Sequence, residues 1–241
     1  RGAARESLER VKSAILAIGL HVGSHRMVAN LLPAELPKEA SALDLALAVS
    51  LLAASGLIPG EVLLGRRFFG ELSLGGSLET SRGAVLMADL SRTSQDRELI
   101  VPLANAAEAA VIPGARVLGA THLNDVIAHL RGEHALDLVK PIIGVSRVHH
   151  VCFSEVQGQL RAKRALEIAA AGGHNVLLVG PPGSGKTMLA KRLPSILPAL
   201  NEEERVEVTR VYSAVGKLSS VARGEERPFR APHHTASEPA L

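Results

Sequence analysis

The stretch NVLLVGPPGSGKTMLAKRLP, from Asn175 to Pro194, decides the fold of the region around it. The apolar run NVLLV predicts a strand, and KTMLAKRL after the glycines predicts a helix. Between them, GPPGSGKT at 180–187 matches the pattern G-x-x-x-x-G-K-[S/T] of loops that grip nucleotide phosphates. A strand, this loop and a helix in that order predict an α/β nucleotide-binding domain.

Each residue type in this phosphate loop has a physical role. Gly183 and Gly185 permit backbone torsions that turn N–H groups toward a phosphate, at the positive end of the following helix. We expect Lys186 to reach the β- and γ-phosphates and Thr187 to hold Mg²⁺ through the bound nucleotide, so ATP and Mg²⁺ are the predicted ligands. The predicted nucleotide-binding residues are Gly180, Pro181, Pro182, Gly183, Ser184, Gly185, Lys186, Thr187 and Met188.

Turnover of ATP needs more groups than this loop supplies. Hydrolysis requires a positioned water and a second hold on Mg²⁺, usually from acids that end another apolar strand. The acids after Thr187 lie in polar sequence, and NEEERVEVTRVYSAV at 201–215 predicts a solvated helix with Asn201 as its N-cap. We therefore expect the chain to bind ATP without hydrolysing it, and the sequence indicates no catalytic residue.

Composition narrows the class of protein. A chain of 241 residues that is 46% hydrophobic and 21% charged predicts one or two globular cores. The net charge of +3 permits a polyanionic partner, but with no Trp and one Tyr any contact with nucleic acid should be to its backbone. Cys152 is the only cysteine, which excludes an intramolecular disulfide and favours a reducing, cytoplasmic location.

No stretch of the sequence predicts a membrane span. The longest apolar run, Leu45–Ile58, is shorter than the roughly 20 residues that a bilayer requires. We interpret this run as part of a buried helix and expect no association with membranes.

The region upstream of the phosphate loop predicts a second α/β unit that ends near Arg131. In chain order the expected elements are an amphipathic helix at 6–18, a strand at 27–36, an apolar helix at 42–54, a hairpin at 66–83 around Gly75–Gly76, and then strand, helix, strand and helix at 97–103, 105–112, 115–120 and 121–132. Next comes an irregular link, and FSEVQGQLRAKRALEIAAAGG at 153–173 predicts a helix in which Val156 and Leu160 belong to the apolar side. The position of its segment RAKRAL at 161–166, just before the nucleotide strand, suggests a helix beside the adenine, whereas its charges favour a solvated face, which we prefer.

Several motifs together resemble one family, the bacterial ComM-type AAA+ ATPases, also called YifB or magnesium chelatase-like proteins. The most specific motif is PFRAPHHTAS at 228–237, after FSEVQGQLRAKRALEIAAAGGHNVLLVGPPGSGKTMLAKRLPSILPALNEEE at 153–204. Upstream, NLLPAELPKEASALDLALAVSLLAASGLI at 30–58 and IVPLANAAEAAVIPGARVLGATHLNDVIAHLRG at 100–132 extend the resemblance over nearly the whole chain.

The resemblance implies an α/β protein built from a Lon protease-like α+β N-terminal domain and a partial P-loop AAA+ domain. These would be residues 1–141, N-terminally incomplete, and residues 151–241, joined by a link at 142–150. Family members are homo-hexameric ATPases, and the competence-associated ones resemble DNA helicases that drive branch migration in natural transformation and recombination. The resemblance also implies a fragment that lacks the second acidic motif, the sensors and the arginine finger, so its status as an enzyme stays open.

Two alternative functions remain at this point. A motor similar to magnesium chelatase shares the AAA+ core but would remodel a protein partner, and DNA-stimulated ATP turnover would separate it from a DNA motor. A truncated product that binds nucleotide without turnover is the third possibility.

The Lon-like resemblance raises proteolysis by a serine–lysine pair, which the sequence does not support. Ala42 stands at the aligned place of the nucleophile, with Ser41 one step away, and Val85 stands where the Lon pattern has its lysine. Without an amine to accept its proton, Ser41 has no activator. We interpret Ser41 as the N-cap of the apolar helix at 42–54, with Asp44 in its first turn.

The basic residues near the C-terminus suggest a second kind of contact. The hypothesis is that they lie on a Pro-bounded insert and touch DNA phosphates, with packing against a neighbouring segment as the alternative. The residues concerned are Arg227, Arg230, His233 and His234. No cysteine or acid at ligand spacing accompanies the histidine pairs at 149–150 and 233–234, so we expect no zinc site.

Overall fold

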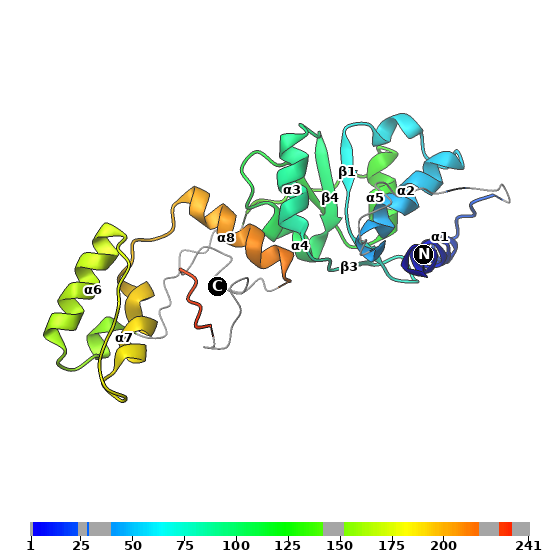
Figure 1. Cartoon of the computed structure of the whole chain (residues 1–241). Coiled ribbons are helices and arrows are strands. Elements are labelled where there is room, and N and C mark those ends of the chain that lie inside the picture. The colour runs from blue at the N-terminus through cyan, green and yellow to red at the C-terminus, as the bar shows by residue number, and fades with distance from the viewer. Residues whose placement is uncertain (1, 24–27, 29–39, 142–151, 217–226, 233–241) are drawn as a thin grey trace. The chain divides into compact units, whose positions relative to one another are not determined.

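The computed structural model describes residues 2–23, 28, 40–141, 152–216 and 227–232. The chain forms two compact units (Figure 1): unit 1 comprises Arg1–Ile142 and Arg210–Lys217, and unit 2 comprises Ile143–Thr209 and Leu218–Leu241. The first division falls next to the link expected at 142–150. Helices and a parallel sheet occur together, which confirms the α/β class.

Unit 1 is built on a parallel sheet. The strands β1 (Arg66–Phe68), β4 (Glu98–Pro102) and β5 (Val117–Ala120) are hydrogen-bonded in the order β1-β4-β5 (Figure 1). Parallel neighbours require crossover connections, and the chain supplies α3 (Ala84–Thr93) between β1 and β4 and α4 (Leu103–Ala109) between β4 and β5. With α5 (Leu123–Leu130) after β5, the strand–helix–strand–helix order expected for 97–132 is confirmed.

Both faces of this sheet are buried, which explains the continuous apolar run of β4. Ile100 and Leu118 share a core with residues of α1 (Gly2–Ala17), α2 (Asp44–Ala54) and α5. Leu99 and Val117 alternate with them and are also fully buried. Side chains on neighbouring strand positions point to opposite faces, so the sheet lies between two layers of helices.

Gly119 of β5 lies where α4 comes closest to the sheet. A Cβ at this position would stand 2.7 Å from Leu103 Cδ1 and 3.1 Å from Ala106 Cβ. Gly119→Ala is therefore expected to destabilise unit 1 by about 1–2 kcal/mol, measured by urea denaturation, because overpacking displaces α4. Gly60→Ala is the matched control, since a Cβ there meets nothing within 4 Å. Equal midpoints for the two variants would contradict the prediction.

The first helices of unit 1 follow their apolar patterns. The amphipathic helix expected at 6–18 is confirmed as α1, whose Val11, Ala14 and Ile15 are fully buried. The apolar helix expected at 42–54 is confirmed as α2, preceded by the 3₁₀ turn η1 (Ala40–Leu43). The strand expected at 27–36 lies outside the described residues, except for Val28.

The hairpin expected at 66–83 is only partly correct. A short antiparallel pair does form, between β2 (Glu71–Leu72) and β3 (Leu78–Glu79), around the predicted glycine turn. The residues before it instead form β1, which pairs in parallel with β4. Gly70 separates the two sheets with φ of +145°, and a Cβ there would stand 2.9 Å from the ring of Pro102. The change of sheet therefore depends on a backbone position that only glycine suits.

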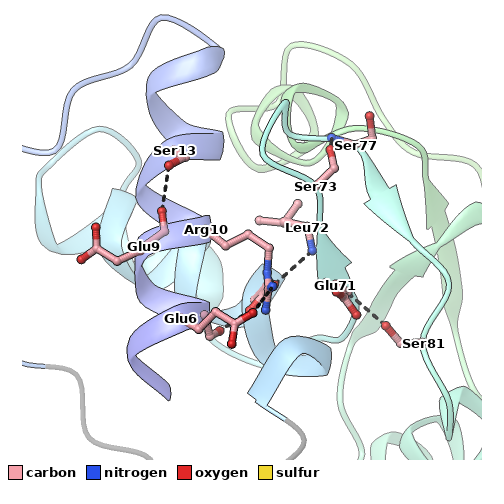
Figure 2. A network of polar contacts seen from close by, with 11 residues as sticks. Glu6, Glu9, Arg10, Ser13, Glu71, Leu72, Ser73, Ser77 and Ser81 are labelled. Carbon is pink, nitrogen blue, oxygen red and sulfur yellow. Dashed lines mark hydrogen bonds and ion pairs between the residues drawn. The ribbon is translucent and has the colours of Figure 1, made fainter. Parts of the chain in front are cut away.

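A buried carboxylate joins α1, α2 and β2. Asp44 is fully buried, accepts hydrogen bonds from Ser7 Oγ and from Arg10 Nε at 2.6 Å, and also accepts the backbone N–H of Leu72 at 3.3 Å. Figure 2 shows Arg10 pointing from α1 toward Leu72, and the bond from Glu71 N to Ser81 Oγ on the other side of β2. The hydrogen bond with Asp44 raises the pKa of Arg10.

The prediction that Ser41 caps the apolar helix is wrong. Helix α2 begins at Asp44, its N-cap is Leu43 without a side-chain cap bond, and Ser41 lies in η1. Asp44 serves Ser7, Arg10 and Leu72 instead of closing a capping box. At the position of the Lon lysine, Val85 is fully buried in α3.

Unit 2 has a smaller core next to the phosphate loop. Its described elements are η3 (Phe153–Glu155), α6 (Leu160–Gly172), α7 (Lys186–Arg192), η4 (Leu193–Ile196) and the first part of α8 (Glu202–Ala214). Phe153, Val156, Leu166 and Leu189 form the core, and Leu178 packs against it. Residues of α6, α7 and the segment before the loop lie in this core or against it, so these three parts of unit 2 pack together.

Two expectations for unit 2 need correction. The helix expected at 153–173 begins at Leu160, whose side chain is 78% exposed, because Gly158 and Gln159 both have positive φ and interrupt it. The strand expected at 175–179 is not formed, and this segment pairs with no strand among the described residues. A strand requires a hydrogen-bonded neighbour, and here only Leu178 ties the segment to the core.

The capped helix that the sequence predicts at 201–215 forms as α8, but it is not solvated throughout, because Val206, Thr209 and Ser213 are buried. Asn201 Oδ1 accepts the N–H of Glu204 at 2.8 Å, and Glu204 Oε2 accepts the N–H of Asn201 at 2.9 Å. This reciprocal pair is a capping box at the start of α8, so the prediction of Asn201 as an N-cap is confirmed. None of the helices in the described ranges has the length and apolar character needed to cross a bilayer.

Candidate functional site

The phosphate loop lies between the segment 174–179 and α7. Ser184 N–H donates to Pro181 O at 3.3 Å and closes a turn. Gly183 and Gly185 have φ of +79° and +85°. Both glycines thus adopt the left-handed conformations predicted for a loop whose N–H groups face an anion.

Lys186 is the cation of the loop, and its side chain folds back onto the loop backbone. Its Nζ donates to Gly180 O and Pro181 O, both at 2.8 Å, and lies 3.3 Å from Ser184 Oγ. All these partners are neutral oxygens of the loop itself. Charged phosphate oxygens accept stronger hydrogen bonds from an ammonium than neutral oxygens do, so an anion can replace them.

Thr187 and Met188 lie in the first turn of α7 and are exposed, whereas Leu189 is buried in the core of unit 2. The hydroxyl oxygen of Thr187 is the kind of hard ligand that Mg²⁺ takes together with phosphate oxygens. Two left-handed glycines, an ammonium and a hydroxyl form a donor set that fits a Mg²⁺-bound nucleotide phosphate. The described residues contain no group of three or more His, Cys, Asp and Glu that could hold a metal ion by themselves.

The loop has a contact that the sequence did not indicate. Gln159, immediately before α6, donates from Nε2 to Ser184 O at 3.3 Å. Its φ of +54° is unusual for a residue other than glycine. The sequence alone predicts neither the contact with Ser184 nor the positive φ, because a glutamine near the start of a helix is common.

A second unpredicted residue, Arg192, fastens the other end of α7. Its Nη2 lies 2.7 Å from Glu155 Oε2 and its Nε donates to Cys152 O at 3.1 Å. The helix that follows the phosphate loop is thereby held against η3, whose Phe153 is part of the core. In α6, Arg161 and Arg164 are exposed, as expected for a solvated face.

The two described basic residues of the predicted DNA-contact segment differ in their surroundings. The Arg227 guanidinium donates to both carboxylate oxygens of Glu204, at 2.9 and 3.1 Å, and to Pro198 O at 2.7 Å. Arg230 is exposed. The bond from Asn201 N–H and the Arg227 guanidinium lower the pKa of Glu204. His233 and His234 lie outside the described residues.

Comparisons with known families match both units. A family model described as magnesium chelatase, subunit ChlI, matches residues 152–241, and another described as subunit ChlI of Mg-chelatase matches residues 1–105. Together these matches leave out residues 106–151, which comprise about the last quarter of unit 1 and the link.

Curated relatives align with almost the entire chain. It is 44% identical over 237 residues to the uncharacterized protein YifB of Escherichia coli K12, which covers 98% of this chain and 47% of YifB. It is 40% identical over 242 residues to the competence protein ComM of Haemophilus influenzae, covering 98% of this chain and 47% of ComM. It is 38% identical over 240 residues to the uncharacterized protein Mb2921c of Mycobacterium bovis, covering 99% and 48%.

The chain spans about half the length of these relatives, 47–48%. The similarity runs through both units, because each alignment covers 98–99% of this chain. It therefore identifies a family and not merely a shared loop motif. The chain belongs to the magnesium chelatase-like family of ComM and YifB proteins.

Proposed function

We propose that this chain binds ATP with Mg²⁺ through residues 180–188, as the nucleotide-binding portion of a ComM-like AAA+ ATPase. The observation that carries the proposal is Lys186, held inside a loop with two left-handed glycines by three neutral oxygens. Lys186 would exchange these oxygens for the β- and γ-phosphates, and the Thr187 hydroxyl would contact Mg²⁺. ATP supplies the free energy that such motors use.

We extend the proposal to unit 1 and to the whole protein. Unit 1 would be the Lon protease-like domain, without protease activity because Val85 replaces the amine that Ser41 needs. The assembled protein would be a cytoplasmic homo-hexamer that acts on DNA by branch migration. Support comes from the relative named as a competence protein and from the basic segment near the C-terminus.

A second candidate function is a motor that remodels a protein partner, as the resemblance to magnesium chelatase implies. The specific observation in its favour is that both matching family models describe a magnesium chelatase subunit. A third candidate is nucleotide binding without turnover, since the acids after Thr187 lie in polar sequence.

Two measurements test these candidates in order. Titration of the purified chain with Mg²⁺ and a fluorescent ATP analogue should show saturable binding that unlabelled ATP displaces. The product of the complete reading frame should then hydrolyse ATP faster when DNA is added. Hydrolysis that DNA does not change would favour the protein-remodelling motor, and absence of nucleotide binding would overturn the proposal for the loop.

The DNA-contact hypothesis makes different predictions for its two described arginines. Arg230→Ala should lower the affinity for duplex DNA and reduce the slope of log K against log salt by about 0.9, the value for one phosphate contact. Arg227→Ala should change the slope less, since Glu204 already holds the guanidinium. Fluorescence anisotropy at several salt concentrations measures both.

Arg161→Ala is the matched control for net charge, because Arg161 is an exposed arginine of α6 outside this segment. A slope that falls equally in the Arg161 and Arg230 variants would indicate unspecific charge attraction. An unchanged slope in the Arg230 variant would contradict the contact.

A further inference from the structure

Gln159 bridges the start of α6 and the phosphate loop. Its side-chain amide donates to Ser184 O at 3.3 Å, while its own carbonyl accepts the N–H of Lys163 at 2.9 Å in the first turn of α6. The Lys163 ammonium in turn donates to Val156 O, and Val156 is buried in the core of unit 2. Gln159, which contacts the loop, is therefore anchored through Lys163 to the core of unit 2.

The contact controls the orientation of one peptide group. In a trans peptide, the carbonyl of one residue and the N–H of the next point in opposite directions. Because Gln159 holds Ser184 O on its own side, the N–H of Gly185 is turned to the other side of the loop backbone. Among the described residues, no protein acceptor binds this N–H.

The backbone of Gln159 supports a role for its side chain. A φ of +54° is costly for residues with a Cβ, and Gly or Asn adopt it more readily. Neither of those has a side chain that reaches as far as glutamine. Helix α6 gains no cap bond from this residue, since no side-chain cap is formed at its N-terminus. Such strain is typical of positions where a functional contact fixes the conformation.

We propose that Gln159 is a positioning residue for nucleotide binding: its amide fixes the Ser184–Gly185 peptide so that the Gly185 N–H faces the phosphate. The inference rests on the proposed nucleotide binding by this loop. Recognition of the phosphate portion of the nucleotide is therefore expected to depend on Gln159.

The test compares two variants that remove the amide. Gln159→Leu keeps the size of the side chain and the backbone cost, whereas Gln159→Gly removes the cost. Both should bind Mg²⁺-ATP about three- to tenfold more weakly than the original chain, the effect of losing one neutral hydrogen bond. Gln157→Leu is the matched control, because Gln157 is an exposed glutamine two positions earlier; the affinity of this variant should not change.

A spectroscopic readout separates positioning from a general loss of structure. In ¹H–¹⁵N spectra of the original chain, the Gly185 amide resonance should shift on addition of inorganic pyrophosphate. At equal saturation this shift should be reduced in both Gln159 variants, while the resonances of core residues such as Leu166 and Leu189 stay in place.

The outcomes distinguish this inference from the function on which it rests. If the original chain binds neither ATP nor pyrophosphate, the proposed function fails. If it binds them and Gln159→Gly binds equally well with an unchanged Gly185 shift, only the role of Gln159 is overturned. Weaker binding in Gln157→Leu as well would also overturn it, because the effect would then belong to the whole turn.

Discussion

Replacing Asp44 with alanine should lower the free energy of unfolding by about 3 kcal/mol, at the lower end of the range for breaking a buried ion pair from one side. The carboxylate is fully buried and binds Ser7, Arg10 and the backbone of Leu72, so three elements lose a shared partner. The Arg10 guanidinium, whose side chain is 19% exposed, would be left without its nearest charge. Urea denaturation followed by circular dichroism measures the change.

Two further variants show whether the burial of the charge is the cause. Asp44→Asn keeps an oxygen acceptor and should lose less stability than Asp44→Ala. Glu6→Ala removes another carboxylate near Arg10, which lies 3.7 Å from Nη1 and is 76% exposed, and should cost less than about 0.5 kcal/mol. Equal losses for Asp44→Ala and Glu6→Ala would mean that burial does not matter here.

Periodic apolar patterns predicted most of unit 1, because burial decides those elements. The run RELIVPL predicts a buried strand, and both of its faces are covered in β4. The apolar patterns at 115–120 and 121–132 likewise predict β5 and α5, respectively. These patterns work because each side chain's own polarity determines the side on which it lies.

Pairing between distant segments could not be predicted in the same way. The pattern at 66–83 indicates strands but not their partners, so β1 was assigned to a hairpin instead of the parallel sheet with β4. Asp44 likewise resembles an ordinary first-turn acid until α1 brings Ser7 and Arg10 to it. In both cases, the segment that packs against these residues determines their structural role, and their local sequence pattern does not.

The candidate site divides along the same line. The spacing of Gly183, Gly185 and Lys186 predicts a loop conformation, and the observed torsions agree with it. Gln159 contributes through a contact across 25 positions of sequence. The ion pair between Arg227 and Glu204 is also distant in sequence, so the basic segment shows its charge but not how much of it is already paired.

Lys186→Ala should weaken the binding of Mg²⁺-ATP by at least about 10-fold, since a hydrogen bond to a charged group contributes about 1.5–3 kcal/mol. The loop would lose the only side-chain cation that the phosphate motif provides. Its stability should change little, because the three contacts of Nζ are with oxygens at the surface of the loop. Titration with a fluorescent ATP analogue gives the affinity, and urea denaturation gives the stability.

The same helix offers a matched control, because Lys191 is an exposed lysine of α7 that lies outside the phosphate motif. Lys191→Ala removes an equal charge and should leave the affinity within about twofold, since exposed charges near a site are screened by salt. Lys186→Arg keeps the charge but replaces a compact ammonium with a planar guanidinium, so it should recover only part of the affinity. If Lys186→Ala and Lys191→Ala weaken binding equally, ATP is attracted by net charge and the loop is not its phosphate site. If Lys186→Ala alone weakens it, the ammonium that contacts Gly180 O and Pro181 O is the group that holds the phosphates.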